Sequence, residues 1–372
     1  MKTLVILSIV ALSSATSLFE NEFLHFLKDW DIWQQDPPQN TSDISQSEQI
    51  TIPAPTADYR FFTCPLNCVC QVRVVQCSDA GLKSVPANIP KGTVMLDLQN
   101  NKINEIKEGD LKNLPSLYAL FLVNNQISKI HPKAFRSIKH LKLLYLSWNL
   151  LPQIPNNLPT SLLELRIDGN EIKKIQKGDF QGMKFLHVLE ISGNPFDTTD
   201  IEPDAFNGVQ RLMYIRISEG KLSSVPKNLP SKLYELYLDH NRISSIERED
   251  FRRYKDLCRL DLSYNKIKEV ENGSLAYLPN LRLIHLENNI IKKVPASVKE
   301  LKYLQALYLH NNNNNISKIE VDDFCPKESG VKKLHYSGIS LFGNPVKYWE
   351  IQPASFRCVS GAHGVQLGNF KK

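Results

Sequence analysis

The stretch Leu257-Cys-Arg-Leu-Asp-Leu-Ser-Tyr-Asn-Lys-Ile267 is one copy of a unit, L-x-x-L-x-L-x-x-N-x-I/L, that occurs eleven times in the chain. The other copies, close ones first and looser ones after them, lie at Leu117–Ile127, Leu141–Leu151, Leu162–Ile172, Leu186–Phe196, Leu233–Ile243, Leu281–Ile291, Thr93–Ile103, Leu212–Leu222, from Leu304 and around Ile339–Asn344. Self-similarity with a period of about 20–29 residues is typical of proteins built from stacked short repeats. This repeat decides the fold.

The spacing of the leucines predicts one short strand in each unit. Alternate residues of a strand point to opposite faces, so the leucines of L-x-L share one face and the x residues share the other. One strand cannot bury its leucines alone, but parallel neighbours form a continuous core in which each buried leucine contributes roughly 1.5–3 kcal/mol. The sequence therefore predicts an α/β fold, a leucine-rich-repeat solenoid with a concave parallel β-sheet.

The asparagine at the ninth position of the unit is expected to point inward as well. A buried amide is stable only when it is hydrogen-bonded, and the nearest partners are the backbone groups of the turns between coils. The asparagines should therefore form a ladder along the stack. One repeat has Gly220 at this position, so the ladder should be interrupted there.

The repeat lengths vary in a regular way. Between fourth-position residues from Val75 to Ile339 the steps are 21, 24, 24, 21, 24, 26, 21, 24, 24, 23 and 32 residues. The short steps contain proline pairs, as in Val85-Pro-Ala-Asn-Ile-Pro90, which favour an extended convex segment and exclude a helix. The 24-residue steps leave room for a short helical turn. The last step contains Cys325 and predicts a loop that leaves the stack, here called the ear.

The first 16 residues are predicted to be a secretory signal peptide. A single lysine precedes the apolar run Leu4–Leu12, and small residues follow it. This run is too short to span a bilayer. Because the sequence contains no other uninterrupted apolar run of spanning length, we expect a secreted protein without a membrane span.

Residues 17–60 differ in composition from everything after them. Eight acidic residues face only Lys28 and Arg60, and no repeat is present, so this segment is predicted to be a disordered acidic tail or propeptide. Its dispersed carboxylates could bind calcium weakly; otherwise no cofactor or metal is expected. The chain carries a formal charge of +6, so the body from Phe61 onward is strongly basic.

Four cysteines with the spacing Cys64-x3-Cys68-x-Cys70-x6-Cys77 open the body. In a reducing compartment such a cluster would favour zinc. Behind a signal peptide it favours two disulfides that cover the open end of the solenoid. We therefore expect an N-terminal cap over residues 61–92, before the repeats of residues 93–324.

Three cysteines remain. Cys325 and Cys358 are expected to pair across the far end, where residues 325–372 would form the ear repeat and the C-terminal cap. Cys258 is left over at a variable position of its repeat, and is either a free thiol or an intermolecular link.

The cysteine pattern, the alternating repeat lengths and the ear resemble a class I small leucine-rich proteoglycan, the family of the decorin, biglycan and asporin group. The likeness extends from Cys64 to the end and is carried by Leu96–Ile103, Glu271–Ala276 and Asn344–Cys358. Further stretches resemble the asporin-like branch, namely His131–Phe135, Leu186–Glu190, Arg253–Leu257 and Val365–Phe370. Two departures are the missing aspartate run and Asn311–Asn315, which lengthens the penultimate repeat by about two residues.

The resemblance implies the pairs Cys64–Cys70 and Cys68–Cys77. It also implies binding to fibrillar collagen, regulation of fibril assembly and mineralisation, and sequestration of growth factors of the TGF-β family. Tyr214-Ile-Arg-Ile217 with Glu219 resembles the collagen-binding segment of the group, so Arg216 and Glu219 are candidate contacts. Aromatic and charged residues at concave positions complete the candidate collagen site: Tyr214, Tyr237, Asp239, Arg259, Asp261, His285 and Tyr308. A homodimer through the concave face is a further expectation.

Three sequons fit N-glycosylation: Asn272-Gly-Ser, Asn315-Ile-Ser and Asn40-Thr-Ser. Asn272 ranks first because it follows a predicted strand, where a surface loop is expected. The serines before Cys64 are not followed by glycine, so a glycoprotein without a glycosaminoglycan chain is expected.

Other function classes find less support. The sequence contains no Gly-rich phosphate loop, no G-x-S-x-G and no H-E-x-x-H, so an enzyme is not expected. Nucleic acid is an improbable partner for a secreted chain. Lysine pairs after the repeats, such as Lys292-Lys293, either attract sulfated glycans or acidic proteins or form a solvated flank. The alternative function is a soluble recognition or signalling module that binds a cell-surface receptor.

Overall fold

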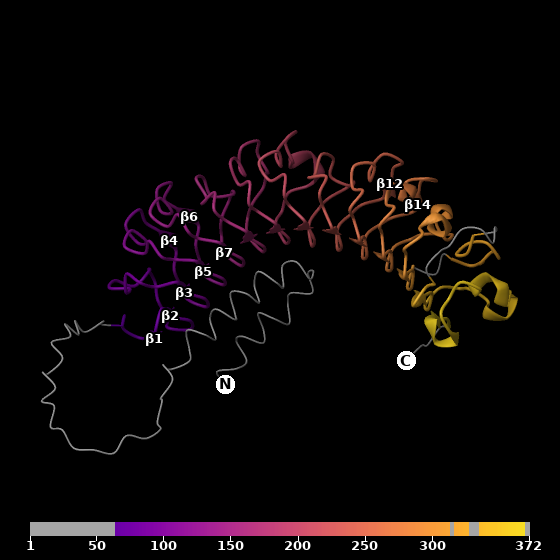
Figure 1. The fold of residues 1–372 in the computed structure, drawn as a ribbon, viewed down its shortest axis with the longest axis horizontal. Helices are drawn as coiled ribbons and strands as arrows, with labels where there is room; N and C mark the ends of the chain where they lie inside the picture. The colour runs from indigo at the N-terminus through magenta and orange to yellow at the C-terminus, as the bar shows by residue number, and fades with distance from the viewer. Residues whose placement is uncertain (1–63, 313–315, 327–334, 369–372) are drawn as a thin grey trace, which may run out of the picture. The chain divides into compact units, whose positions relative to one another are not determined.

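The computed structural model describes residues 64–312, 316–326 and 335–368. The predicted signal peptide, the acidic tail with its weak calcium sites, and the sequons at Asn40 and Asn315 lie outside these ranges. The described residues belong to one compact unit, Thr63–Lys372. In that unit the repeats form a curved stack of coils whose strands line the inner side (Figure 1).

One sheet of 14 strands runs through the whole stack, and each strand contributes only two or three residues. In spatial order it consists of β1 (Val69–Gln71), β2 (Val74–Gln76), β3 (Met95–Asp97), β5 (Ala119–Phe121), β7 (Leu143–Tyr145), β8 (Glu164–Arg166), β9 (Val188–Glu190), β10 (Tyr214–Arg216), β11 (Glu235–Tyr237), β13 (Arg259–Asp261), β15 (Leu283–His285), β16 (Ala306–Tyr308), β17 (Gly338–Ser340) and β18 (Val365–Gln366). β1 and β2 are antiparallel, and every later pair is parallel.

The outer side carries short elements. Two small parallel sheets pair β4 (Glu105–Ile106) with β6 (Lys129–Ile130), and β12 (Ser245–Ile246) with β14 (Glu269–Val270). The helical segments of the described ranges are all 3-10 helices: η1 (Thr198–Asp200), η2 (Leu275–Tyr277), η3 (Ala296–Glu300), η4 (Tyr348–Glu350), η5 (Pro353–Phe356) and η6 (Ala362–Gly364). Among the 24-residue steps, only the one from Leu260 to Ile284 contains such a helix; hydrogen-bonded turns fill the others.

The predicted alignment of the repeats is confirmed at every step. The fourth-position residues face one another across the sheet in the order Val75, Leu96, Leu120, Leu144, Leu165, Leu189, Ile215, Leu236, Leu260, Ile284, Leu307 and Ile339. In the repeat Leu257–Ile267, the residues Leu257, Leu260, Leu262 and Ile267 are fully buried. The leucine columns therefore form one continuous core, as the spacing requires.

The asparagine ladder is present. Asn265 is representative: its Nδ2 donates to the carbonyl of Leu238 at 2.9 Å and to that of Leu262 at 3.1 Å, while its Oδ1 accepts from the N–H of Ile243 at 3.0 Å. Each asparagine thus joins its own coil to the preceding one. Only 8% of the surface of Asn265 is exposed, so these bonds replace hydration that the coil edges have lost.

The ladder is interrupted at Gly220, as expected. Asn194 and Asn241 bind the coils on either side through the Ile167 carbonyl at 3.1 Å and the Ile217 carbonyl at 2.7 Å. Between them Gly220 has no side-chain amide. A Cβ at this position would lie 2.8 Å from Asn241 Oδ1. The joint between the coils of Asn194 and Gly220, which belongs to the 26-residue step, therefore lacks the buried amide of the ladder. On its outer side the Thr198 hydroxyl bridges it instead, donating to the Ser224 carbonyl at 3.1 Å and accepting from the Ser223 N–H at 3.1 Å.

Disulfides close both ends of the stack. Cys64 is bonded to Cys70 and Cys68 to Cys77, which ties the segment before β1 to the β1–β2 hairpin. Cys325, in the ear between β16 and β17, is bonded to Cys358. These are the expected pairs. Covering the terminal coils in this way keeps the end leucines of the core out of water.

The residue before each ladder asparagine adopts a left-handed backbone conformation. Asn and Gly usually occupy this position, but four repeats place a bulkier side chain there, with φ from 54° to 58°: Trp148, Glu219, His240 and, at 52°, Tyr264. Such residues are strained by about 1 kcal/mol relative to Gly or Asn.

Candidate binding face

The concave side of the sheet is lined by the residues at the third, fifth and seventh positions of each repeat. The structure brings most of the predicted site residues together here, because β10, β11, β13, β15 and β16 are neighbours in the sheet. On these strands or just after them lie Tyr214, Arg216, Tyr237, Asp239, Arg259, Asp261, His285 and Tyr308. Within this face the side chains form three interacting groups.

The first group is centred on Tyr237. Its hydroxyl donates to Glu235 Oε2 at 2.6 Å and accepts from Arg259 Nη1 at 3.0 Å. The guanidinium carbons of Arg216 and Arg259 lie 5.5 Å and 5.8 Å from the centre of its ring, and the ring of Tyr214 lies 5.1 Å away. Burial, followed by the charge of Glu235, raises the pKa of Tyr237. Tyr237 therefore remains a neutral ring that fixes two cations.

The second group is centred on Asp239. Its carboxylate accepts from Arg216 Nη2 at 3.2 Å and from the Ser218 hydroxyl, and it lies 3.0 Å from Nδ1 of His240. The side chain of Asp239 is only 5% exposed, whereas that of Arg216 is 37% exposed. Asp239 therefore orients Arg216, and Arg216 is the member of the pair that a partner can reach.

The third group lies toward the C-terminal end and is aromatic. The ring of His285 stacks on Tyr308 at 4.4 Å, and the ring of His310 stacks on Phe342 at 4.4 Å. Tyr308 and His310 meet edge to face at 6.1 Å. Nδ1 of His285 is 2.9 Å from Glu287 Oε1. Burial lowers the pKa of His310, so this ring is neutral at physiological pH.

Asp261 separates the second and third groups. Its Oδ1 accepts from the Ser263 N–H at 2.9 Å and from the Ser263 hydroxyl at 2.7 Å. Burial raises the pKa of this carboxyl, and the charge of His285 partly offsets the effect. Asp261 therefore places a half-buried, hydrogen-bonded carboxylate between the arginine groups and the aromatic group.

Glu219 does not join the face. It lies three residues beyond the end of β10, in the left-handed turn, and its side chain is exposed. No hydrogen bond or ion pair links it to Arg216 in the part of the chain that the structure describes. The structure thus separates the two residues that the resemblance grouped as candidate contacts.

A further polar group, outside the three described above, lies on the N-terminal half of the same face. Tyr145 donates to Glu164 Oε1 at 2.8 Å, and Arg166 lies between Glu164 and Glu190, with Nη1 at 3.5 Å from Glu190. Next to them, burial and then the charge of Glu190 raise the pKa of Asp168 to about 6. These residues occupy the same repeat positions as the predicted site, which is the signal by which they could have been found.

The predicted collagen site also left out several members of the three groups. Ser218, His310 and Phe342 occupy seventh positions, and Glu235 occupies a third position. Their repeat positions therefore place all four on the concave side of the sheet. His240 follows Asp239 in the left-handed turn, where a strand pattern predicts no lining side chain. What the pattern could not supply was which neighbours form contacts.

The sequon at Asn272 lies in a turn between β14 and η2. The Asn272 side chain is exposed, and Gly273 has a φ of 84°. Ser274 of the same sequon is fully buried. A glycan on Asn272 would therefore project from the outer side of the stack, away from the concave face.

Two further properties bear on function. Within residues 64–312, 316–326 and 335–368, no three His, Cys, Asp or Glu side chains are grouped so that they could hold a metal ion. Over the same ranges no helix has the length and apolar character needed to cross a membrane.

The repeats and the N-terminal cap match known sequence families. Residues 92–151 and 231–291 match "Leucine rich repeat", residues 156–238 match "BspA type Leucine rich repeat region (6 copies)", and residues 63–90 match "Leucine rich repeat N-terminal domain". One chain of a solved complex of Latrophilin 3, Unc5D and FLRT2, the last as its leucine-rich repeats, is similar in fold. The TM-score is 0.57 with 26% identity, over 79% of this chain and 100% of that chain.

Full-length relatives define the family. Asporin of Bos taurus is 55% identical over 377 residues, covering 100% of both chains. Biglycan of Homo sapiens is 49% identical over 371 residues, covering 99% of this chain and 98% of the relative. Biglycan of Xenopus laevis is 54% identical over 309 residues, or 83% of each chain. The chain therefore belongs to the class I small leucine-rich proteoglycans of the extracellular matrix, and it is an asporin-like member of that family.

Proposed function

We propose that this protein is secreted into the extracellular matrix, where it binds fibrillar collagen through the concave face of β10, β11, β13, β15 and β16. Collagen binding would allow it to regulate fibril assembly and mineralisation. We further propose that it sequesters growth factors of the TGF-β family. The collagen and growth-factor partners rest on the family, and the choice of strands rests on the arrangement of side chains described above.

The observation that carries the proposal is the pair of arginines held on Tyr237. Arginine and aromatic residues are the usual anchors of protein interfaces. Arg216 and Arg259 are fixed by Asp239, Glu235 and the tyrosine ring while remaining 37% and 32% exposed. Anchors that are already ordered lose little side-chain entropy when a partner binds.

The dimensions of the face suit a rod-shaped partner. Five neighbouring strands at a spacing of about 4.8 Å span roughly 19 Å across the stack. A collagen triple helix presents its X and Y side chains outward and offers no pocket of its own. The concave sheet of the repeat protein must therefore curve around the rod. Its arginine and carboxylate groups can pair with charged side chains of the collagen, and its aromatic rings can pack on the imino-acid side chains.

Binding of the secreted protein to immobilised collagen I tests the proposal. Arg216→Ala and Arg259→Ala should each weaken binding by about tenfold or more, as truncation of an interface arginine commonly does. Arg252→Ala is the matched control, since Arg252 is 68% exposed in the outer turn between β12 and β13 and pairs with the neighbouring Glu249.

The position of the site is tested in the same assay. His285→Ala combined with Tyr308→Ala removes the aromatic group and leaves both arginines. If only this double variant loses binding, the collagen site lies in the C-terminal repeats. Unchanged binding in all of these variants would refute a concave collagen site. Competition by a TGF-β-family growth factor against collagen then reports whether the two partners share the face.

An alternative function is a recognition module for a cell-surface receptor. It is favoured by the similarity to the FLRT2 repeats, which were solved in a complex with Latrophilin 3 and Unc5D. Retained binding to cells by a variant that no longer binds collagen would support it. A homodimer through the concave face would bury the same arginines, so light scattering with and without collagen peptide distinguishes dimerisation from collagen binding.

The processing of the chain belongs to the same proposal. We expect removal of a signal peptide near residue 16, an acidic tail or propeptide up to residue 60, and glycans at Asn272 and, outside the described residues, at Asn40 and Asn315. Intact mass of the secreted protein before and after deglycosylation measures the cleavage site and the glycan number together. A mass increment typical of a glycosaminoglycan chain would contradict the proposed processing.

A further inference from the structure

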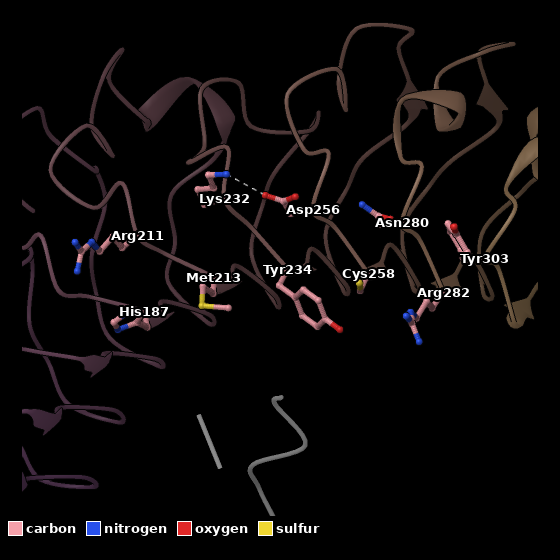
Figure 2. Close-up of a pocket in the computed structure, with 10 residues that line it drawn as sticks. All are labelled: His187, Arg211, Met213, Lys232, Tyr234, Asp256, Cys258, Asn280, Arg282 and Tyr303. Atoms are coloured by element: carbon pink, nitrogen blue, oxygen red, sulfur yellow. Dashed lines mark hydrogen bonds and ion pairs between the residues drawn. The ribbon is translucent and has the colours of Figure 1, made fainter. Parts of the chain in front are cut away.

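A groove runs along one flank of the stack, at the edge where the chain enters the strands. Its volume is about 850 Å³. Figure 2 shows that its lining comes from successive coils, and that the side chains follow one another along the stack. The lining consists of the second residue of each unit and the residue just before the unit: His187, Arg211, Met213, Lys232, Tyr234, Asp256, Cys258, Asn280, Arg282 and Tyr303. None of these is a third-, fifth- or seventh-position residue, so the groove is separate from the concave site.

The groove carries unpaired positive charge. Lys232 and Asp256 form an exposed ion pair at 3.3 Å and neutralise each other. Arg211 and Arg282 lie on either side of this pair, and neither has a carboxylate partner in the described part of the chain. Two exposed guanidinium groups therefore remain for a ligand, and both come from coils that the asparagine ladder holds in fixed register.

Aromatic surface lies between the two arginines and on their outer sides. The guanidinium carbon of Arg211 lies 5.9 Å from the centre of the Phe185 ring. The Nζ atom of Lys142 lies 5.8 Å from the centre of the same ring. Phe185 is 49% exposed and Tyr303 is 45% exposed. Tyr234 lies in the middle of the groove in Figure 2, beside the thiol of Cys258. A hydrogen bond with that thiol raises the pKa of the Tyr234 hydroxyl, so the ring is neutral.

We propose that this groove binds a sulfated glycan. Guanidinium groups bind sulfate and phosphate oxygens through two parallel N–H donors, which an ammonium group cannot do. The tyrosine and phenylalanine rings offer apolar faces on which the C–H faces of sugar rings can pack. The groove follows the stack over several coils, which suits an extended oligosaccharide.

An acidic peptide is the competing ligand class, and the backbone disfavours it. Extended peptides usually bind by adding a strand to an exposed sheet edge, where backbone groups are free. Along this groove the backbone groups are already paired between coils, as in the bonds from the Arg282 N–H to the Cys258 carbonyl at 2.8 Å and from the Cys258 N–H to the Tyr234 carbonyl at 2.9 Å. Only side chains remain to recognise the ligand, and these favour sulfate.

A charge-matched pair of variants tests the site. The probe is a fluorescent, fully sulfated heparin octasaccharide, titrated with the full-length secreted protein. Arg211→Ala with Arg282→Ala should weaken binding by about tenfold or more, because each arginine supplies charge-assisted hydrogen bonds. Lys266→Ala with Lys268→Ala removes the same charge from exposed lysines beyond the other end of the strands, and should change binding less than about twofold if only screened, long-range attraction is lost.

The unpaired cysteine gives a second, local measurement. The other six cysteines are in disulfides, so a maleimide reagent reports on Cys258 alone. Saturating octasaccharide should slow its alkylation in the wild type and not in the double arginine variant. Equal losses in the two double variants would overturn the site. Equal affinity for polyglutamate of the same charge would overturn the ligand class, and unprotected Cys258 at saturation would overturn the placement in the groove.

Discussion

Replacing one ladder asparagine should destabilise the whole stack. In Asn265→Ala the Ile243 N–H loses its acceptor, at 3.0 Å in the wild type, while the Leu238 carbonyl loses one donor, at 2.9 Å, and keeps the Asn241 amide at 3.0 Å. The N–H left buried without a partner costs about 1–3 kcal/mol and the lost hydrogen bond to the carbonyl about 0.5–1.5 kcal/mol, so the free energy of unfolding should fall by about 2–4 kcal/mol. Urea unfolding monitored by circular dichroism measures this loss.

Two companion variants make the measurement specific. Asn280→Ala removes an exposed amide that donates to the Lys255 carbonyl at 2.9 Å, and should change stability by less than about 1 kcal/mol. Asn265→Asp keeps the acceptor but faces the Leu238 carbonyl with a buried charge. Burial would raise the pKa of this new carboxyl above its unfolded value, so the variant should regain stability as the pH falls and the carboxyl becomes protonated. A loss below 1 kcal/mol in Asn265→Ala, or no pH response in Asn265→Asp, would refute the ladder as a stabilising element.

Three further outcomes are expected. Asp168 has its pKa raised from 3.8 to about 6, so its contribution to stability is lost as the pH rises through about 6; Asp168→Asn should remove a dependence of about 1–3 kcal/mol between pH 4 and 7 in urea unfolding. Glu219→Asn should raise the free energy of unfolding by about 0.5–1 kcal/mol, because asparagine tolerates the left-handed φ of 54°. Cys325→Ser with Cys358→Ser opens a disulfide loop with a sequence separation of 33. The free energy of unfolding should fall by about 3–4 kcal/mol, which a lower melting temperature would report.

The architecture followed from the sequence because its determinants are local and repeated. Leu260 and its equivalents had to align, since a slip of one residue would expose every leucine of a coil. The binding face followed only in part. Repeat positions identify Arg216, Tyr237 and Arg259 as lining residues. The contact of one tyrosine with two arginines, however, depends on rotamers and on residues from three neighbouring strands, β10, β11 and β13.

Three features were beyond the sequence pattern for different physical reasons. Glu219 follows the strand so closely that the pattern kept it beside Arg216, whereas the left-handed turn turns it to the solvent side. The flank groove depends on residues just outside the core positions, which carry no periodic hydrophobic signal. Cys258 could be described only as a free thiol or a cross-link; in the structure it is unpaired and buried at the groove.

The interrupted joint at Gly220 has a mechanical consequence. A protein attached at several points to a fibre experiences tension along its long axis when the tissue is loaded. At this joint the part-exposed bonds of the Thr198 hydroxyl to Ser223 and Ser224 stand in for the buried ladder amide, so stretching should first part the molecule between the coil of Asn194 and the coil of Gly220. The arc would then yield as two shorter, still-folded arcs that close again when the load is released.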